Sequence, residues 1–189
     1  MVGAILILAA GVGASSTHAF NEPDGFRGVP WGANEDVLRA RLGEMGSDGR
    51  WRDASCFEYP AETRWLGDRA CRDTFMLEDI KVDAIYAFRD ARFVRVLLTF
   101  RSADFDRIVT IFVERYGPPT TDTHEAFKTR GGLDSVNRVM AWLGPNVAIT
   151  LNRFGNKIVE GAAMVTTQEE IRESNRLRRE QLKRAARDF

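Results

Sequence analysis

Histidine is almost absent from this chain, which has two in 189 residues. His18 lies in an apolar segment near the N-terminus, and His124 stands beside Glu125 in a polar stretch. A histidine-dependent triad or a multi-histidine metal site needs several imidazole groups, or one held by fixed partners. The composition therefore argues against both kinds of site, and we interpret His124 as a solvated side chain.

The sequence also lacks the glycine patterns of nucleotide-binding loops. Gly11-Val12-Gly13 and Gly131-Gly132 are its glycine clusters, and neither follows a predicted strand in the spacing of a phosphate-binding loop. Carboxylates are abundant, but they stand at predicted turns and helix starts, where their charge has a structural explanation. These carboxylates are Asp79, Asp83, Asp90, Asp104 and Asp106. We therefore expect no catalytic residue, no metal and no cofactor, and keep a carboxylate-dependent hydrolase as a third hypothesis for function.

An excess of one charge sign is missing as well. Lys and Arg together number 27, as do Asp and Glu, so the formal net charge is zero. Nucleic-acid binding usually requires a basic surface, because the phosphate backbone dominates affinity. The overall charge gives no support to a nucleic-acid partner.

Residues 1–19 contain no Lys, Arg, Asp or Glu. A short apolar run is followed by small residues, and Thr17-His18-Ala19 resembles the small-x-small site of signal peptidase. The run is shorter than the roughly 20 apolar residues that span a bilayer. We predict a signal peptide over 1–19 and a periplasmic or secreted protein; an uncleaved interfacial anchor and an ordinary buried segment are the alternatives.

Two cysteines, Cys56 and Cys71, are the only ones in the chain. In an exported protein such a pair predicts one disulfide bond, whereas four ligands of a zinc site are not available. Unpaired thiols remain the alternative, because the prediction depends on export.

Three helices are indicated by periodicity and capping residues. Asn34 is a plausible N-cap for a helix that ends at Gly43. Ser102 is expected to cap a helix over 102–116, whose apolar residues recur at helical spacing on one face. A capping box at Thr167-Gln168-Glu169-Glu170 predicts a polar C-terminal helix.

Apolar runs between these helices predict β-strands. One strand is expected near Trp51 to Tyr59, and others over 71–77, 80–88, 93–100, 138–143, 147–152 and 157–166. The stretch 120–133 is predicted to be an exposed, mobile loop. The fold class that follows is α+β: an antiparallel sheet with two amphipathic helices packed on one face, as a duplicated α-β-β-β unit in one interpretation, plus a polar C-terminal helix. The predicted organisation is a signal peptide (1–19), a single α+β domain (20–167) and a charged C-terminal helix (168–189).

Two patterns resemble a group of uncharacterised exported bacterial proteins. They are Phe26-Arg27-Gly28-Val29-Pro30-Trp31-Gly32 and Tyr86-Ala87-Phe88-Arg89-Asp90 followed by a helix ending in Tyr116-Gly117-Pro118. The layout is more distantly similar to the fold shared by the BamE lipoprotein and the β-lactamase inhibitor protein. That resemblance implies a binding or assembly role, and it identifies no functional residue. Unlike BamE, this chain has no lipid-attachment cysteine.

Two stretches are candidates for a partner surface. The first holds the aromatic residues Trp51, Tyr59 and Trp65, because aromatic residues on an irregular segment can face outward, although core packing is the alternative for the tryptophans. The second is the C-terminal helix, whose basic residues outnumber its acids. These basic residues are Arg176, Arg178, Arg179, Lys183, Arg184 and Arg187.

We predict a non-catalytic module that binds another periplasmic or envelope protein. The second hypothesis is a carrier of a small molecule or lipid, with a pocket between helix and sheet. The basic helix is interpreted as a solvated terminal helix, as a docking arm for an acidic partner, or as a peripheral contact with an anionic membrane surface.

Overall fold

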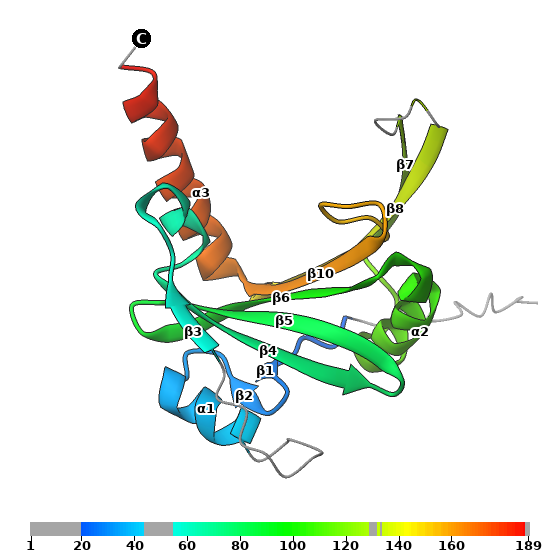
Figure 1. The fold of residues 1–189 in the computed structure, drawn as a ribbon, viewed down its shortest axis with the longest axis horizontal. Helices are drawn as coiled ribbons and strands as arrows, with labels where there is room; N and C mark the ends of the chain where they lie inside the picture. Colours follow the sequence, from blue (N-terminus) through cyan, green and yellow to red (C-terminus); the bar gives the residue numbers. More distant parts are fainter. Residues whose placement is uncertain (1–19, 44–54, 129–131, 133, 188–189) are drawn as a thin grey trace, which may run out of the picture.

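The computed structural model describes residues 20–43, 55–128, 132 and 134–187. It has the predicted α+β class: a large antiparallel sheet with helices against one face and a C-terminal helix at one end (Figure 1). The predicted signal segment 1–19 and Trp51 lie outside the described residues. No helix in the described ranges is long and apolar enough to cross a membrane.

The large sheet has eight strands in the spatial order β3-β4-β5-β6-β10-β9-β8-β7. Their bounds are β3 (Ser55–Glu58), β4 (Arg69–Leu77), β5 (Ile80–Arg89), β6 (Arg92–Arg101), β7 (Thr121–Lys128), β8 (Asp134–Leu143), β9 (Val147–Asn152) and β10 (Glu160–Thr167). Every neighbouring pair is antiparallel. The order is symmetric about the β6–β10 seam: each half is a helix followed by a four-strand meander.

Helices α1 (Glu35–Gly43) and α2 (Phe105–Tyr116) cover one face of this sheet. Asn34 caps α1 as predicted, since its Oδ1 accepts a hydrogen bond from the Val37 amide at 3.1 Å. Phe105, Ile108 and Phe112 form the buried side of α2. They share one hydrophobic core with Leu38 of α1 and with the inward side chains of the strands.

Side-chain alternation along the central strands separates a buried face from an open one. Tyr86 on β5 and Val96 on β6 are fully buried toward the helices, while Ile85 and Leu97, one position along, lie on the opposite face. A register shift between β5 and β6 makes Val94 an extra residue, which lets Phe93 and Val96 both face the helices. Within the described residues, α3 and η1 cover one end of the open face.

The segment before α1 forms a short hairpin. Strands β1 (Gly25–Phe26) and β2 (Val29–Pro30) pair with each other across Arg27 and Gly28, both of which have positive φ. Val29 is fully buried by this arrangement. The hairpin therefore anchors the start of the described chain in the core.

The predicted cap of the second helix needs correction. Ser102 lies in the short 3₁₀ turn η2 (Ser102–Asp104), and its hydroxyl donates to the Ile158 carbonyl instead of capping α2. The turn between β5 and β6 contains no glycine, and Asp90 and Ala91 both take positive φ there.

The predicted mobile loop over 120–133 is wrong for most of its length. Strand β7 occupies Thr121–Lys128 and pairs with β8 along its whole length. All but one of its side chains are exposed, so β7 has no buried face to produce hydrophobic alternation. Its backbone hydrogen bonds to β8 define the strand, and the sequence pattern does not reveal them.

The C-terminal helix α3 (Gln168–Ala185) begins at the predicted position. Thr167 caps it by accepting a hydrogen bond from the Glu170 amide at 3.2 Å. In a capping box the Glu170 carboxylate would accept a hydrogen bond from the Thr167 amide. Here it turns toward arginines of the sheet instead. A 3₁₀ helix, η1 (Ala61–Leu66), follows β3 and packs beside α3; the sequence did not indicate it.

Candidate protein-binding surface

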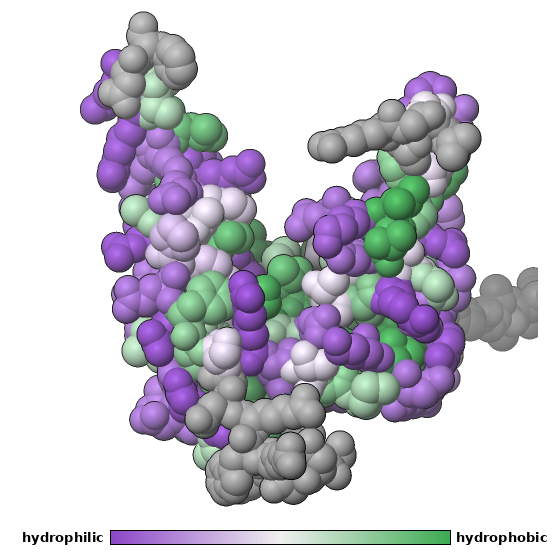
Figure 2. Space-filling view, in the orientation of Figure 1, coloured by the Kyte–Doolittle hydropathy of each residue, from purple (hydrophilic) through white to green (hydrophobic). Residues whose placement is uncertain are grey.

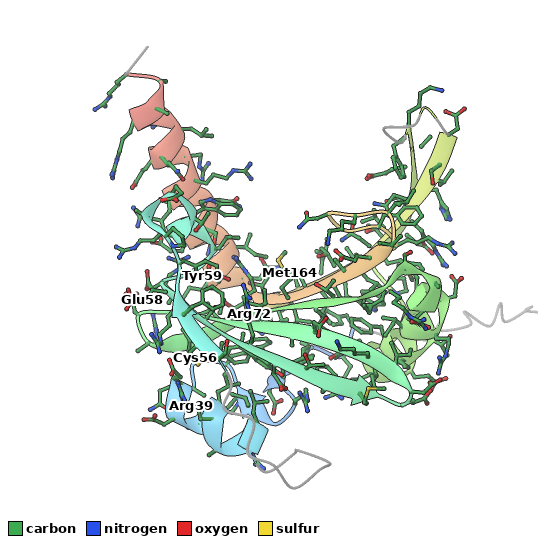
Figure 3. The ribbon with its side chains drawn as sticks, in the orientation of Figure 1. Arg39, Cys56, Glu58, Tyr59, Arg72 and Met164 are labelled. Atoms are coloured by element: carbon green, nitrogen blue, oxygen red, sulfur yellow. A yellow bond between two sulfur atoms is a disulfide. The ribbon has the colours of Figure 1, made fainter. Side chains whose placement is uncertain are left out.

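The open face of the sheet carries an apolar stripe that crosses its central strands. Strand registers place one residue of each strand in a single row. In spatial order the row is Arg72, Ile85, Leu97, Met164, Thr150 and Ala141. Leu97 at the centre is 36% exposed, a high value for a leucine in the middle of an eight-stranded sheet. Figure 3 shows Met164 on the side of the sheet away from α1 and α2.

A second, more polar row runs next to the first. Its members are Thr74, Asp83, Thr99, Ala162, Asn152 and Val139. Thr74 donates to the Asp83 carboxylate at 2.7 Å, and the other polar groups of the row remain partly accessible. We call these two rows the floor. The floor therefore offers apolar and hydrogen-bonding groups side by side.

Two walls rise from the ends of the floor and leave a hollow between them. The first wall consists of α3 and η1; the second consists of β7, the paired part of β8 and the β9–β10 connection (Figure 1). Figure 2 shows the hollow in space-filling form, with hydrophobic side chains along its bottom and both polar and hydrophobic ones on the walls. We call the floor and its two walls the trough.

A buried ionic network fixes the first wall to the sheet. Glu170 of α3 is 2% exposed and accepts two hydrogen bonds from Arg89, at 2.6 and 2.9 Å. Arg95 donates to the same carboxylate at 3.1 Å, and the Ser174 hydroxyl donates to it at 2.7 Å. Burial lowers the pKa of Arg95, while the Glu170 charge opposes that shift.

The same two arginines also hold η1. Arg89 donates to the carbonyls of Arg64 and Trp65, and Arg95 donates to that of Leu66 at 3.1 Å. These carbonyls lie in the last turn of a short helix, where the Arg64 carbonyl also accepts the Gly67 amide at 3.1 Å. One carboxylate and two guanidinium groups therefore join α3, η1 and the sheet, so the first wall has a fixed position.

Two arginines of the first wall and the floor lie over aromatic rings. Arg178 of α3 is over the ring of Trp65, 5.1 Å from its centroid, and Arg72 of β4 is 4.7 Å from the centroid of Phe57. Tyr59 packs against Phe57 at 5.5 Å, and burial raises the pKa of its phenol. Between η1 and α3 is a notch of about 210 Å³. It is lined by Ala61, Arg64, Trp65, Leu177, Glu180, Gln181 and Arg184.

The second wall is held by contacts between the β7–β8 hairpin and the β9–β10 connection. Phe127 of β7 packs edge-on against Phe154 at 5.8 Å, and the Phe154 amide donates to Asn137 at 2.9 Å. Arg138 of β8 forms a two-pronged pair with Asp122, whose pKa is lowered by that hydrogen bond. β7 is the last strand of the sheet, so its outer edge has no partner strand among the described residues.

The predicted disulfide is present between Cys56 and Cys71. The two residues face each other across β3 and β4, and the loop that they close carries Tyr59 and all of η1. Glu35 lies within 4.8 Å of both sulfurs, the one group of metal-ligating side chains found in the described ranges. With both sulfurs in a disulfide, and Glu35 hydrogen-bonded to Arg69, the group does not provide a metal site.

Two other spaces lie outside the trough. The space between α2 and the sheet is about 70 Å³, well below the roughly 300–1,000 Å³ of small-molecule pockets. A cleft of about 530 Å³ opens between the first turns of α3 and the β5–β6 turn, beside Trp31 and Phe93. Acidic and basic side chains balance in it, and its most buried carboxylate, Glu170, belongs to the network described above.

The structure brings some of the predicted partner residues together. Tyr59, Trp65, Arg178 and Arg184 all belong to the first wall or its junction with the floor. Arg176 is bound to Glu173 and Glu180 and is therefore occupied. Arg179 and Lys183 are exposed on the second half of α3, and Arg187 is exposed beyond its end.

Sequence reasoning missed the floor and the network. Ile85, Leu97 and Met164 were interpreted as ordinary strand residues, because an apolar strand does not show which face stays open. A signal existed in β6, where Val96, Leu97 and Leu98 are consecutive and so must place an apolar side chain on each face. No protein family, no curated protein and no solved structure matches this chain.

Proposed function

We propose that the protein is a non-catalytic binding protein that takes part of another protein into the trough. The observation that carries this proposal is the open face of the sheet, with its apolar row at Ile85, Leu97 and Met164. Apolar side chains left open to water mark interaction sites. The predicted resemblance to binding and assembly proteins points in the same direction.

The walls support binding of a protein segment over binding of a small molecule. They lie at opposite ends of the sheet, and contacts described above hold each of them in place (Figure 1). A preformed surface reduces the conformational entropy lost on association. By contrast, the space that a carrier would use, between α2 and the sheet, is about 70 Å³.

The titratable groups also favour binding over hydrolysis. A carboxyl that acts as a general acid usually has a raised pKa. The carboxyl pKa values that depart clearly from their usual range in the described residues are lowered, in each case by a hydrogen bond from arginine: Glu35, Asp79, Asp122 and Glu173. Such carboxylates act as permanent anions in structural ion pairs.

We place the partner outside the cytoplasm, in the periplasm or envelope. The disulfide between Cys56 and Cys71 supports this, because such bonds persist in oxidising compartments. Intact mass of the protein purified from its source, before and after reduction, tests it. A gain of about two hydrogens on reduction together with loss of residues 1–19 would agree with export; a full-length chain with free thiols would contradict it.

Site-specific photocrosslinking in the source cells tests the binding function. A photoreactive amino acid at Leu97 or Met164 should give the same discrete protein adduct. At Glu114, exposed on α2 on the other side of the sheet, it should give none. A matched variant, Leu97→Glu, should remove the adduct formed from position 164, since it places a charge at the centre of the apolar row.

Two results would contradict the proposal. Equal adducts from position 114 and from the floor would show that contact is unspecific. An absence of adducts from both floor positions, in cells where the protein is folded and abundant, would show that the trough is unoccupied.

A further inference from the structure

We propose that the trough selects an acidic protein segment, whose carboxylates bind Arg72 and Arg178. This inference rests on the proposed binding function and names the chemistry of the partner. Both residues are exposed, and both guanidinium groups lie over aromatic rings, of Phe57 and Trp65. Neither has a carboxylate partner within the described part of the chain.

Stacking prepares a guanidinium group for a carboxylate. The ring contacts one flat face of the group and restricts its rotation, while the N–H groups around its rim stay free to donate. These N–H groups match the two oxygens of a carboxylate and form paired hydrogen bonds with them. An arginine that is already oriented loses less conformational entropy when such a pair forms.

Several arginines elsewhere in the protein are neutralised by carboxylates. Arg89 and Arg95 share Glu170, Arg138 is paired with Asp122, and Arg176 with two glutamates. Arg64 and Arg184 line the notch together with Glu180, which is paired with Arg176, and Arg178 lies over the ring of Trp65 beside it. None of these three arginines forms an ion pair with a described carboxylate. An unneutralised cationic cluster at one wall attracts an anionic partner.

The geometry favours a protein segment over a membrane surface as the source of the anions. The notch beside Trp65 and Leu177 is a concave site between two fixed elements, suited to one side chain of a partner. A helix that lies on a membrane needs a broad apolar face. The large apolar side chain exposed on α3 is Leu182, which stands alone among charged neighbours.

A binding experiment with a defined probe tests this inference. The probe is a fluorescent twelve-residue peptide of alternating Glu and Leu, compared with the same peptide containing Gln in place of Glu. We expect the full chain to bind the Glu peptide more tightly at low salt, with the difference falling as salt increases. Each of the substitutions Arg72→Gln and Arg178→Gln should weaken Glu-peptide binding about fivefold and leave Gln-peptide binding unchanged.

Matched control variants remove the same charge elsewhere. Arg101→Gln and Arg107→Gln remove exposed arginines that pair with acids near α2, so they should leave the affinity unchanged. Urea unfolding of all four variants identifies any that fail to fold. Equal affinity for the two peptides, or an equal loss in the controls, would overturn the inference.

Two further measurements distinguish a protein segment from a membrane surface or free phosphate as the source of negative charge. Vesicles of phosphatidylglycerol should bind no better than vesicles of phosphatidylcholine, and inorganic phosphate should not compete with the Glu peptide. Vesicle binding that depends on Arg72 and Arg178, without peptide binding, would assign the cluster to a membrane and overturn the inference. If floor crosslinks form but the arginine variants bind normally, the acidic-segment inference fails and the binding function stands.

Discussion

A single carboxylate carries much of the attachment between α3 and the body of the protein. Glu170 is almost completely buried and accepts hydrogen bonds from Arg89, Arg95 and Ser174. Breaking a buried pair by removing one member costs about 3–5 kcal/mol, because the remaining charge is left without a partner. We expect Glu170→Ala to reduce the free energy of unfolding by that amount, measured by chemical denaturation.

The neighbouring residue provides the control for this prediction. Glu169 is exposed and lies 3.9 Å from Arg92, so Glu169→Ala should change stability by less than about 1 kcal/mol. If the two variants were equally stable, the buried network would not be what holds the first wall.

Glu35 links α1 to β4 and makes stability depend on pH. A hydrogen bond from Arg69 lowers the pKa of Glu35, so the folded state favours its charged form more than the unfolded state does. The resulting stabilisation is present above the ordinary pKa of 4.5 and is lost as pH falls through the lower folded value. We expect Glu35→Gln to destabilise the protein at pH 7 and to have little effect at about pH 2. A difference that stayed constant with pH would contradict this cause.

At the scale of elements, the disulfide controls one wall of the trough. Cys56 and Cys71 are 15 residues apart, and a loop of that length is stabilised by about 3 kcal/mol when it is closed. The double variant Cys56→Ser, Cys71→Ser should lose about that much stability in denaturant unfolding. Reduction of the native protein should have the same effect and leave the double variant unchanged.

The same loop carries Trp65, so its closure should also affect binding. In the double serine variant β3 loses its covalent link to β4, and the contact of Trp65 with Arg178 becomes less constrained. We expect weaker binding of the Glu peptide and increased amide hydrogen exchange over 57–68. Unchanged exchange would show that Arg89 and Arg95 alone position η1.

Across the whole molecule, the parts that face the core were predictable and the parts that form the trough were not. The buried sides of α1 and α2 and the central strands follow from apolar periodicity, because burial is what produces it. β7 and η1 have no buried side chains, so no apolar periodicity indicates them. Backbone pairing with β8 positions β7, and arginines distant in sequence position η1.

The candidate site was predictable only in part for the same reason. Trp65 and the basic second half of α3 were identified by residue type, and the structure places them together. Their relation depends on Glu170, which the capping-box pattern assigned to a local role. A charged residue that fits a local motif gives no sign of a buried long-range contact, so that contact was missed.

The symmetric strand order has a consequence for how the chain folds. Every described strand pair in the large sheet joins strands that follow each other in sequence, except β6 with β10, which pairs residues such as Leu97 and Met164. Local pairs close short loops and form quickly, whereas this seam must wait for the intervening chain. The two halves should therefore fold as separate units that join late. A chain cut in the β6–α2 connection should yield two fragments that reassociate when mixed, and substitutions at the seam should slow folding of the intact protein less than they speed its unfolding.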